Sequence, residues 1–137
     1  MKTCRNRILA LSVLGLVLVI GSAGMGHGQH QPDPNSPRFL AVTALMEFIQ
    51  STGEEPVHQF IEEMMSPAVK AEVSESDLAD LLRSVRSDFS GATFQGAMPE
   101  GPFTVVLMFQ PSGPHGFSRL TFEIEAEPPH RFIFIYY

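Results

Sequence analysis

Cysteine is almost missing from this sequence of 137 residues, and so are the short motifs that carry most enzyme chemistry. The one cysteine, Cys4, has no partner within the chain, so the fold has to depend on its apolar core instead of a disulfide. A Ser-x-x-Lys nucleophile motif does not occur, because Ser66 and Lys70 are four positions apart. A glycine-rich phosphate loop is absent too. We therefore expect neither nucleophilic catalysis nor a bound cofactor.

Positive charge is also scarce, with 9 Lys and Arg against 15 Asp and Glu, which gives a formal net charge of -6. Three of the basic residues, Lys2, Arg5 and Arg7, lie in the first seven positions, and without them the net charge is -9. An acidic surface repels phosphate groups. Nucleic acids and anionic membrane surfaces are therefore poor candidate partners.

The apolar run at residues 8–20 follows this basic start and is shorter than the ~20 residues that a bilayer span needs. The small residues that follow it, at 21–26, suit cleavage by a signal peptidase. We expect residues 1–23 to be a cleaved signal peptide of bacterial type, which predicts a secreted or periplasmic protein without a membrane span. Cys4 precedes the apolar run and so cannot carry a lipoprotein lipid.

Residues 24–37 are rich in Gly, Gln and Pro and have no apolar period, so we interpret them as a flexible leader. His27 and His30 lie in it without a further ligand nearby, and we predict no metal site there. Residues 38–137 then form the folded domain.

Helical spacing of apolar residues predicts three helices in the first half of this domain. The first begins after the cap Ser36 and covers residues 37–50, and the second continues from Val57 to the break at Ser66-Pro67. The third follows Ser74 and should end near Gly91, where glycine can adopt the left-handed conformation that terminates helices.

Strand-like patterns take over after Gly91, at residues 92–97, 103–110, 117–126 and 131–137. In 117–126 the apolar residues alternate with polar ones, which predicts one buried face and one wet face. The Glu-Pro-Pro-His corner at 127–130 should turn the last strand back antiparallel to its neighbour. We predict an α+β domain with N-terminal helices on one side of a curved antiparallel sheet.

The strand, the Glu-Pro-Pro-His-Arg corner and the final strand, with the preceding helices, resemble an NTF2-like module of the cystatin-like superfamily. The resemblance covers roughly residues 38–135 and is closest to the accessory domain of secreted bacterial serine hydrolases related to β-lactamases. It implies a cone-shaped fold with an apolar cavity that in some relatives is catalytic and in others only binds ligands. The hydrolase domain is expected to be absent from this chain, which implies no hydrolase activity.

Few residues are candidates for chemistry. His58 lies one helical turn from both Glu54 and Glu62, but it is near the edge of the apolar stripe, and a solvated histidine is the preferred interpretation. His130 and Arg131 follow the corner, where they either face the cavity mouth or stabilise the turn. Other candidates are the possible acid Glu123 and the possible cavity residues Phe60, Met64 and Phe122.

The final strand is apolar on both sides if it alternates strictly, with Phe132, Phe134 and Tyr136 on one face and Ile133, Ile135 and Tyr137 on the other. The strand at 103–110 has the same two-sided character. Such a surface has to be covered, and dimerisation through the sheet is the preferred explanation.

Three functions remain open. The first is a non-catalytic module that binds a small apolar ligand or a protein partner and dimerises through its sheet. The second is a small isomerase or dehydratase that uses His58 or His130 with a carboxylate in a closed pocket. The third is an accessory domain for a separately encoded serine hydrolase.

Overall fold

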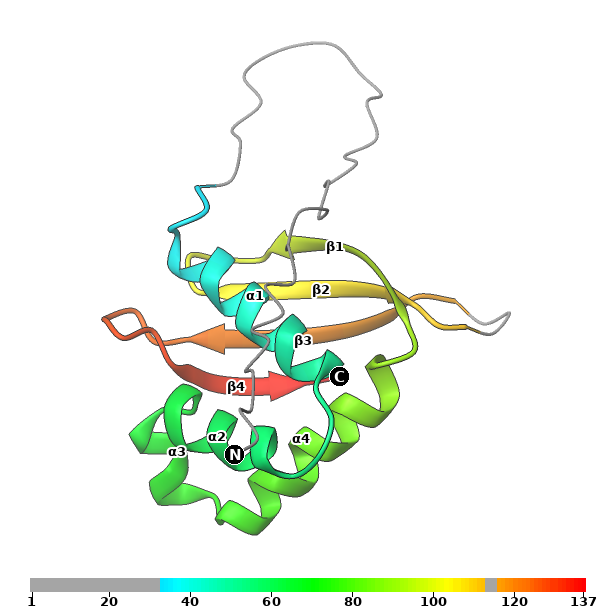
Figure 1. The fold of residues 1–137 in the computed structure, drawn as a ribbon. Coiled ribbons are helices and arrows are strands. Elements are labelled where there is room, and N and C mark those ends of the chain that lie inside the picture. Colours follow the sequence, from blue (N-terminus) through cyan, green and yellow to red (C-terminus); the bar gives the residue numbers. More distant parts are fainter. Residues whose placement is uncertain (1–32, 113–115) are drawn as a thin grey trace, which may run out of the picture. The chain divides into compact units, whose positions relative to one another are not determined.

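The computed structural model describes residues 33–112 and 116–137, so the expected signal peptide (1–23), most of the leader, His27 and His30 lie outside the described residues. Helices come first and strands follow (Figure 1). This confirms an α+β domain. The elements are α1 (Pro37–Gln50), α2 (Glu55–Met64), α3 (Pro67–Glu72), α4 (Glu75–Phe89), β1 (Thr93–Pro99), β2 (Thr104–Gln110), β3 (Ser118–Ile124) and β4 (Phe132–Tyr136).

Helices α1 and α4 begin at serine caps as the sequence predicts, whereas α2 begins after Glu54 without a side-chain cap, and the described residues contain one more helix than expected. Ser36 caps α1 through the amide of Phe39, and Ser74 caps α4 in the same way. Ser66 interrupts the helical chain after α2, yet its hydroxyl also accepts from the Val69 amide and starts α3. Ser66 thus both interrupts the helical chain and caps the next helix. The sequence pattern predicted the interruption but not α3.

α4 ends at Phe89, close to the predicted break at Ser90-Gly91, but not through the left-handed glycine that was expected. Gly91 does not adopt a left-handed conformation, and Ser90 follows the helix with a helical φ of -61° while its amide still donates to the carbonyl of Arg86. Positive φ values occur among the described glycines at Gly53 (88°) and Gly96 (157°). Gly53 allows the tight connection from α1 to α2.

The strands form an antiparallel sheet in the order β1-β2-β3-β4, each hydrogen-bonded to the next in the chain. Val105, Leu107 and Phe109 of β2 share one face with Leu120, Phe122 and Ile124 of β3, and all six are at most 2% exposed. The helices pack on this inner face (Figure 1). The expected alternation along β3 is therefore confirmed for its inward-facing residues.

The prediction for β4 was wrong in its details, because the strand contains a bulge. Ile124 pairs with Phe132 while Glu123 pairs with Phe134, so Ile133 is an extra residue without a partner in β3. Phe132 and Ile135 therefore face the core, whereas Phe134 and Tyr136 face the other side. A prediction based on strict alternation cannot foresee that residues after the bulge change faces.

An aromatic cluster joins the helices to the end of the sheet. The ring of Phe132 lies 5.2 Å from both Phe60 of α2 and Phe122 of β3, and Phe60 contacts Phe48 of α1 at 4.8 Å. The backbone adds a bond from the Ser66 amide to the Phe132 carbonyl at 2.9 Å. Phe132 thus contacts α2 and the α2–α3 connection directly and is linked to α1 through Phe60.

Among the helices of residues 33–112 and 116–137, none has the length and apolar character needed to cross a membrane.

Candidate functional site

The side of the sheet opposite the helices, here called the outer face, carries most of the exposed large apolar residues of the strands. Met98, Phe134 and Tyr136 are 48%, 53% and 48% exposed. Val106 lies between them and is not part of the core cluster, although it is only 2% exposed. Such a clustered apolar surface is uncommon on a protein that functions alone.

The strand register arranges these residues in a row across all four strands. Met98 of β1 pairs with Val106 of β2, which pairs with Thr121 of β3, which in turn pairs with Tyr136 of β4. Phe134 stands beside Tyr136 with the ring centroids 4.9 Å apart in an edge arrangement. The bulge at Ile133 places Phe134 there, because without it Phe134 would share the inner face of Phe132.

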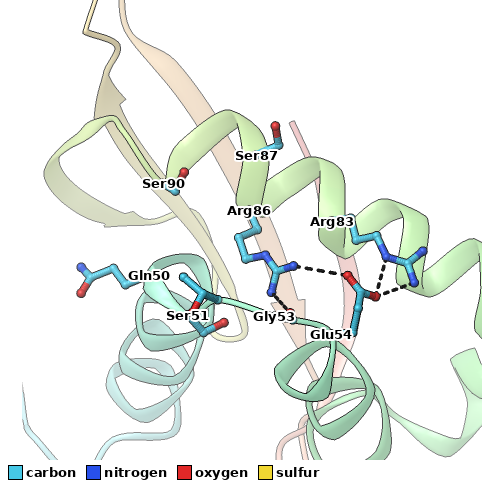
Figure 2. A pocket seen from close by; sticks show the side chains of 9 residues that line it. Gln50, Ser51, Gly53, Glu54, Arg83, Arg86, Ser87 and Ser90 are labelled. Carbon is cyan, nitrogen blue, oxygen red and sulfur yellow. Dashed lines mark hydrogen bonds and ion pairs between the residues drawn. The ribbon is translucent and has the colours of Figure 1, made fainter.

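A second candidate site is a polar depression of about 670 Å³ where the α1–α2 connection meets α4. Figure 2 shows Arg83 and Arg86 reaching from α4 towards Glu54 and Gly53. Arg83 contacts the Glu54 carboxylate at 2.7 Å and Asp80 at 2.7 Å. Arg86 approaches Glu54 at 3.7 Å and donates to the Gly53 carbonyl at 2.6 Å.

The contacts of this depression join α4 to the α1–α2 connection, and the group of Glu54, Arg83 and Arg86 is called the clasp below. The two arginines face two carboxylates, so the charges are compensated and no excess positive charge is left for an anion. Arg86 also lies 5.8 Å above the ring of Phe48. The hydrogen bond from Arg83 lowers the pKa of the Glu54 carboxyl, and the charges of Arg83 and Arg86 act in the same direction.

Sequence reasoning did not identify this clasp. Arg83 and Arg86 are spaced three apart on one helix, which places them on one side of α4. The local sequence does not predict that the α1–α2 connection, about thirty residues earlier in the chain, lies against this side of α4.

His58 has a carboxylate partner, but a different one from those that sequence spacing suggested. Its Nδ1 lies 3.0 Å from Glu75 at the start of α4, and among the described residues its ring makes no hydrogen bond or ion pair with Glu54 or Glu62. The side chains of His58 and Glu75 are 56% and 70% exposed. The pair is thus on the surface and does not form the closed histidine-acid pocket that an isomerase would need.

The Pro-Pro corner uses its candidate residues for its own hydrogen bonds. His130, at a φ of 56°, donates its amide to Glu127, and its Nδ1 lies 3.0 Å from the Glu125 carbonyl. Because a carbonyl only accepts, this ring nitrogen carries a proton. The amide of Arg131 donates to the Glu125 carboxylate at 3.2 Å. The amide and ring of His130 and the backbone amide of Arg131 therefore close the turn, whereas the buried Nε of Arg131 has no hydrogen-bond partner among the described residues.

The remaining candidates divide between the core and the outer face of the sheet. Phe60 and Phe122 both belong to the core and contact Phe132, and Met64 packs against the same core. Glu123 is exposed on the outer face, where it pairs with Thr104 and Phe134. Within the described part of the chain, no three His, Cys, Asp or Glu side chains are grouped so as to hold a metal.

Comparison of the chain with protein-family models, with curated proteins and with solved structures gives no match. The NTF2-like relationship therefore stays a prediction from the residues that suggested it.

Proposed function

We propose that this protein is a secreted, non-catalytic NTF2-like module that acts through protein association, and that its outer sheet face joins it to a second copy of itself. The observation that carries the proposal is the cluster of exposed apolar side chains on the outer face, Met98, Phe134 and Tyr136, with the buried Val106 between them. Helices cover the inner face of the sheet, and the outer face has no helix of its own among the described residues (Figure 1).

A non-catalytic role is supported by His58 and His130, the histidines that the structure describes. His58 lies on the surface beside Glu75, and the ring of His130 is used in closing the Pro-Pro corner. General acid-base catalysis needs a titratable group that faces the substrate in a sheltered site. The inward-facing residues proposed for a ligand cavity, Phe60 and Phe122, instead contact other aromatic rings, which favours a protein partner over a small apolar ligand.

The size of the outer face predicts a weak dimer. Four strands spaced by about 4.8 Å and about 20 Å long give a face of roughly 400 Å² in projection. Stable interfaces bury about 800 Å² on each partner, so this one belongs to the small class. Association should therefore depend on concentration in the micromolar range and above.

Sedimentation equilibrium from low micromolar to several hundred micromolar protein tests the proposal. We expect a reversible monomer-dimer equilibrium that Phe134→Ser shifts strongly to monomer. The matched control is Leu40→Ser, which removes a similarly exposed apolar side chain (55%) from α1 and should leave the equilibrium unchanged. A monomer at the highest concentration, or a dimer that responds to Leu40 and not to Phe134, would overturn the proposal.

A further inference from the structure

Two opposite charges are placed symmetrically on the outer face, at equal distances from its centre. Arg119 and Glu123 lie on β3 two residues before and two residues after Thr121. In the register with β2, Arg119 pairs with Met108 and Glu123 pairs with Thr104. Both charged side chains are exposed, and they are the charges that β3 presents on this face.

Neither charge is neutralised within one copy of the protein, as far as the described residues show. The ion pairs of that part of the chain involve His58, Arg83, Arg86 and their acidic partners, and none includes Arg119 or Glu123. The two residues are four positions apart along a strand, or about 13 Å, which is beyond the reach of an ion pair between them.

Symmetry turns this spacing into a complementary surface. In one arrangement of the dimer, the outer faces of two copies are stacked on each other. The two-fold axis lies between the two sheets and runs perpendicular to the strands, along the row of Met98, Val106, Thr121 and Tyr136. The axis reverses the strand direction in the second copy, so a residue two places before Thr121 lies over a residue two places after it. Each Arg119 then faces Glu123 of the second copy, and the contact is repeated by symmetry.

The other simple arrangement is unfavourable. An axis along β3 would place Arg119 on Arg119 and Glu123 on Glu123, and like charges that face each other across an interface weaken the association. The crossing axis also stacks the apolar row on itself in an aligned sheet sandwich, in which the mean strand directions stay within about 30°.

We infer that the proposed dimer has its two-fold axis across the strands at Thr121, and that reciprocal ion pairs between Arg119 and Glu123 of the two copies determine this geometry. The inference rests on the proposed association through the outer face, and it adds the residues that select a second copy as the partner. The apolar side chains of the outer face contribute contact area to the dimer. Arg119 and Glu123 determine how the two sheets are aligned with each other.

Charge reversal tests the inference, with dimer dissociation constants measured by sedimentation equilibrium. We expect Arg119→Glu and Glu123→Arg each to weaken the dimer by at least about tenfold, because each puts like charges together twice. The double variant R119E/E123R restores the pairs with their signs exchanged and should dimerise nearly as well as the original protein. Glu47→Arg on α1 is the control for a change of net charge away from the face.

Glu123→Arg is the most discriminating variant. It makes an acidic protein less negative, so a general reduction of repulsion between copies would strengthen the dimer, whereas loss of the reciprocal pairs weakens it. Circular dichroism and thermal unfolding of each variant show that the fold is retained. If the original protein is a monomer, the proposed association itself fails. If it dimerises but Glu123→Arg does not weaken the dimer, or the double variant does not restore it, only the axis and the ion pairs are refuted.

Discussion

Phe132 and Phe134 are two residues apart in β4 and lie on opposite faces of the sheet. Phe132 is fully buried against Phe60 and Phe122, while Phe134 is 53% exposed beside Tyr136. The bulge at Ile133 places them on opposite faces. Phe132 therefore stabilises the core, and Phe134 belongs to the surface of the proposed association.

The two phenylalanines should respond differently to truncation. Phe132→Ala removes a ring from the centre of the aromatic cluster and should lower the free energy of unfolding by about 3–5 kcal/mol. Phe134→Ala removes surface that is largely in water and should change it by about 0.5 kcal/mol or less in the monomer. Urea denaturation at low protein concentration measures both values. Similar losses for the two variants would contradict the assignment of faces.

Deletion of single residues tests the bulge itself. Removing Ile133 leaves Phe132 inward, Phe134 outward and Ile135 inward without the extra residue, so the fold should survive at a cost of roughly 1–2 kcal/mol for the half-buried side chain. Removing Ile135 instead should be much more damaging, because it brings the hydroxyl of Tyr136 to an inward position. Thermal unfolding of the two deletion variants compares them directly, and equal losses of stability would contradict the bulge at Ile133.

The clasp at Glu54 should make stability depend on pH. Arg83 lowers the pKa of the Glu54 carboxyl in the folded state. The ionised carboxylate therefore contributes fully to stability above the ordinary glutamate pKa of about 4.3. This contribution is lost as the pH falls through the lower pKa of the folded state. Glu54→Gln should therefore be less stable than the original protein at neutral pH, and the difference should vanish in acid. Urea titrations between neutral and acid pH measure this.

Glu47→Gln is the control for the clasp, since it removes an exposed glutamate of α1 that takes part in none of the ion pairs of the described residues. A difference between Glu54→Gln and the original protein that persists unchanged at low pH would refute the role of the ionised carboxylate.

The signal peptide predicted for residues 1–23 implies a shorter secreted form. Expression of the full chain in a bacterial host should give a protein outside the cytoplasm that has lost about the first 23 residues, because small residues follow the apolar run. Intact-mass spectrometry of that fraction identifies the new N-terminus. Leu14→Arg with Leu16→Arg interrupts the apolar run and should leave the protein unprocessed in the cytoplasm. Recovery of the unaltered chain with Met1 retained would contradict the prediction.

The order of helices and strands could be predicted from the sequence because local patterns specify it. Serine caps fixed where α1 and α4 begin, and the change from helical to alternating spacing after Gly91 located the sheet. Alternation along β3 also told which of its side chains face the core. These properties depend on residues that are close together in the chain, so they can be read without knowledge of the fold.

The candidate sites depend on residues that only folding brings together. The partner of His58 is Glu75 of another helix and not the neighbouring glutamates, and Glu54 meets arginines about thirty positions away. The faces of β4 were decided by pairing with β3, since a bulge exists only in the register between two strands.

The sequence by itself determined an α+β domain, its acidic charge and the absence of the common catalytic motifs. The tertiary structure decided which apolar residues are core and which form the outer face, because strand register and helix packing are interactions between distant segments. It also placed Arg119 and Glu123 symmetrically about Thr121 on that outer face. The charges themselves are visible in the sequence, but their relation to the apolar row exists only once the four strands are aligned.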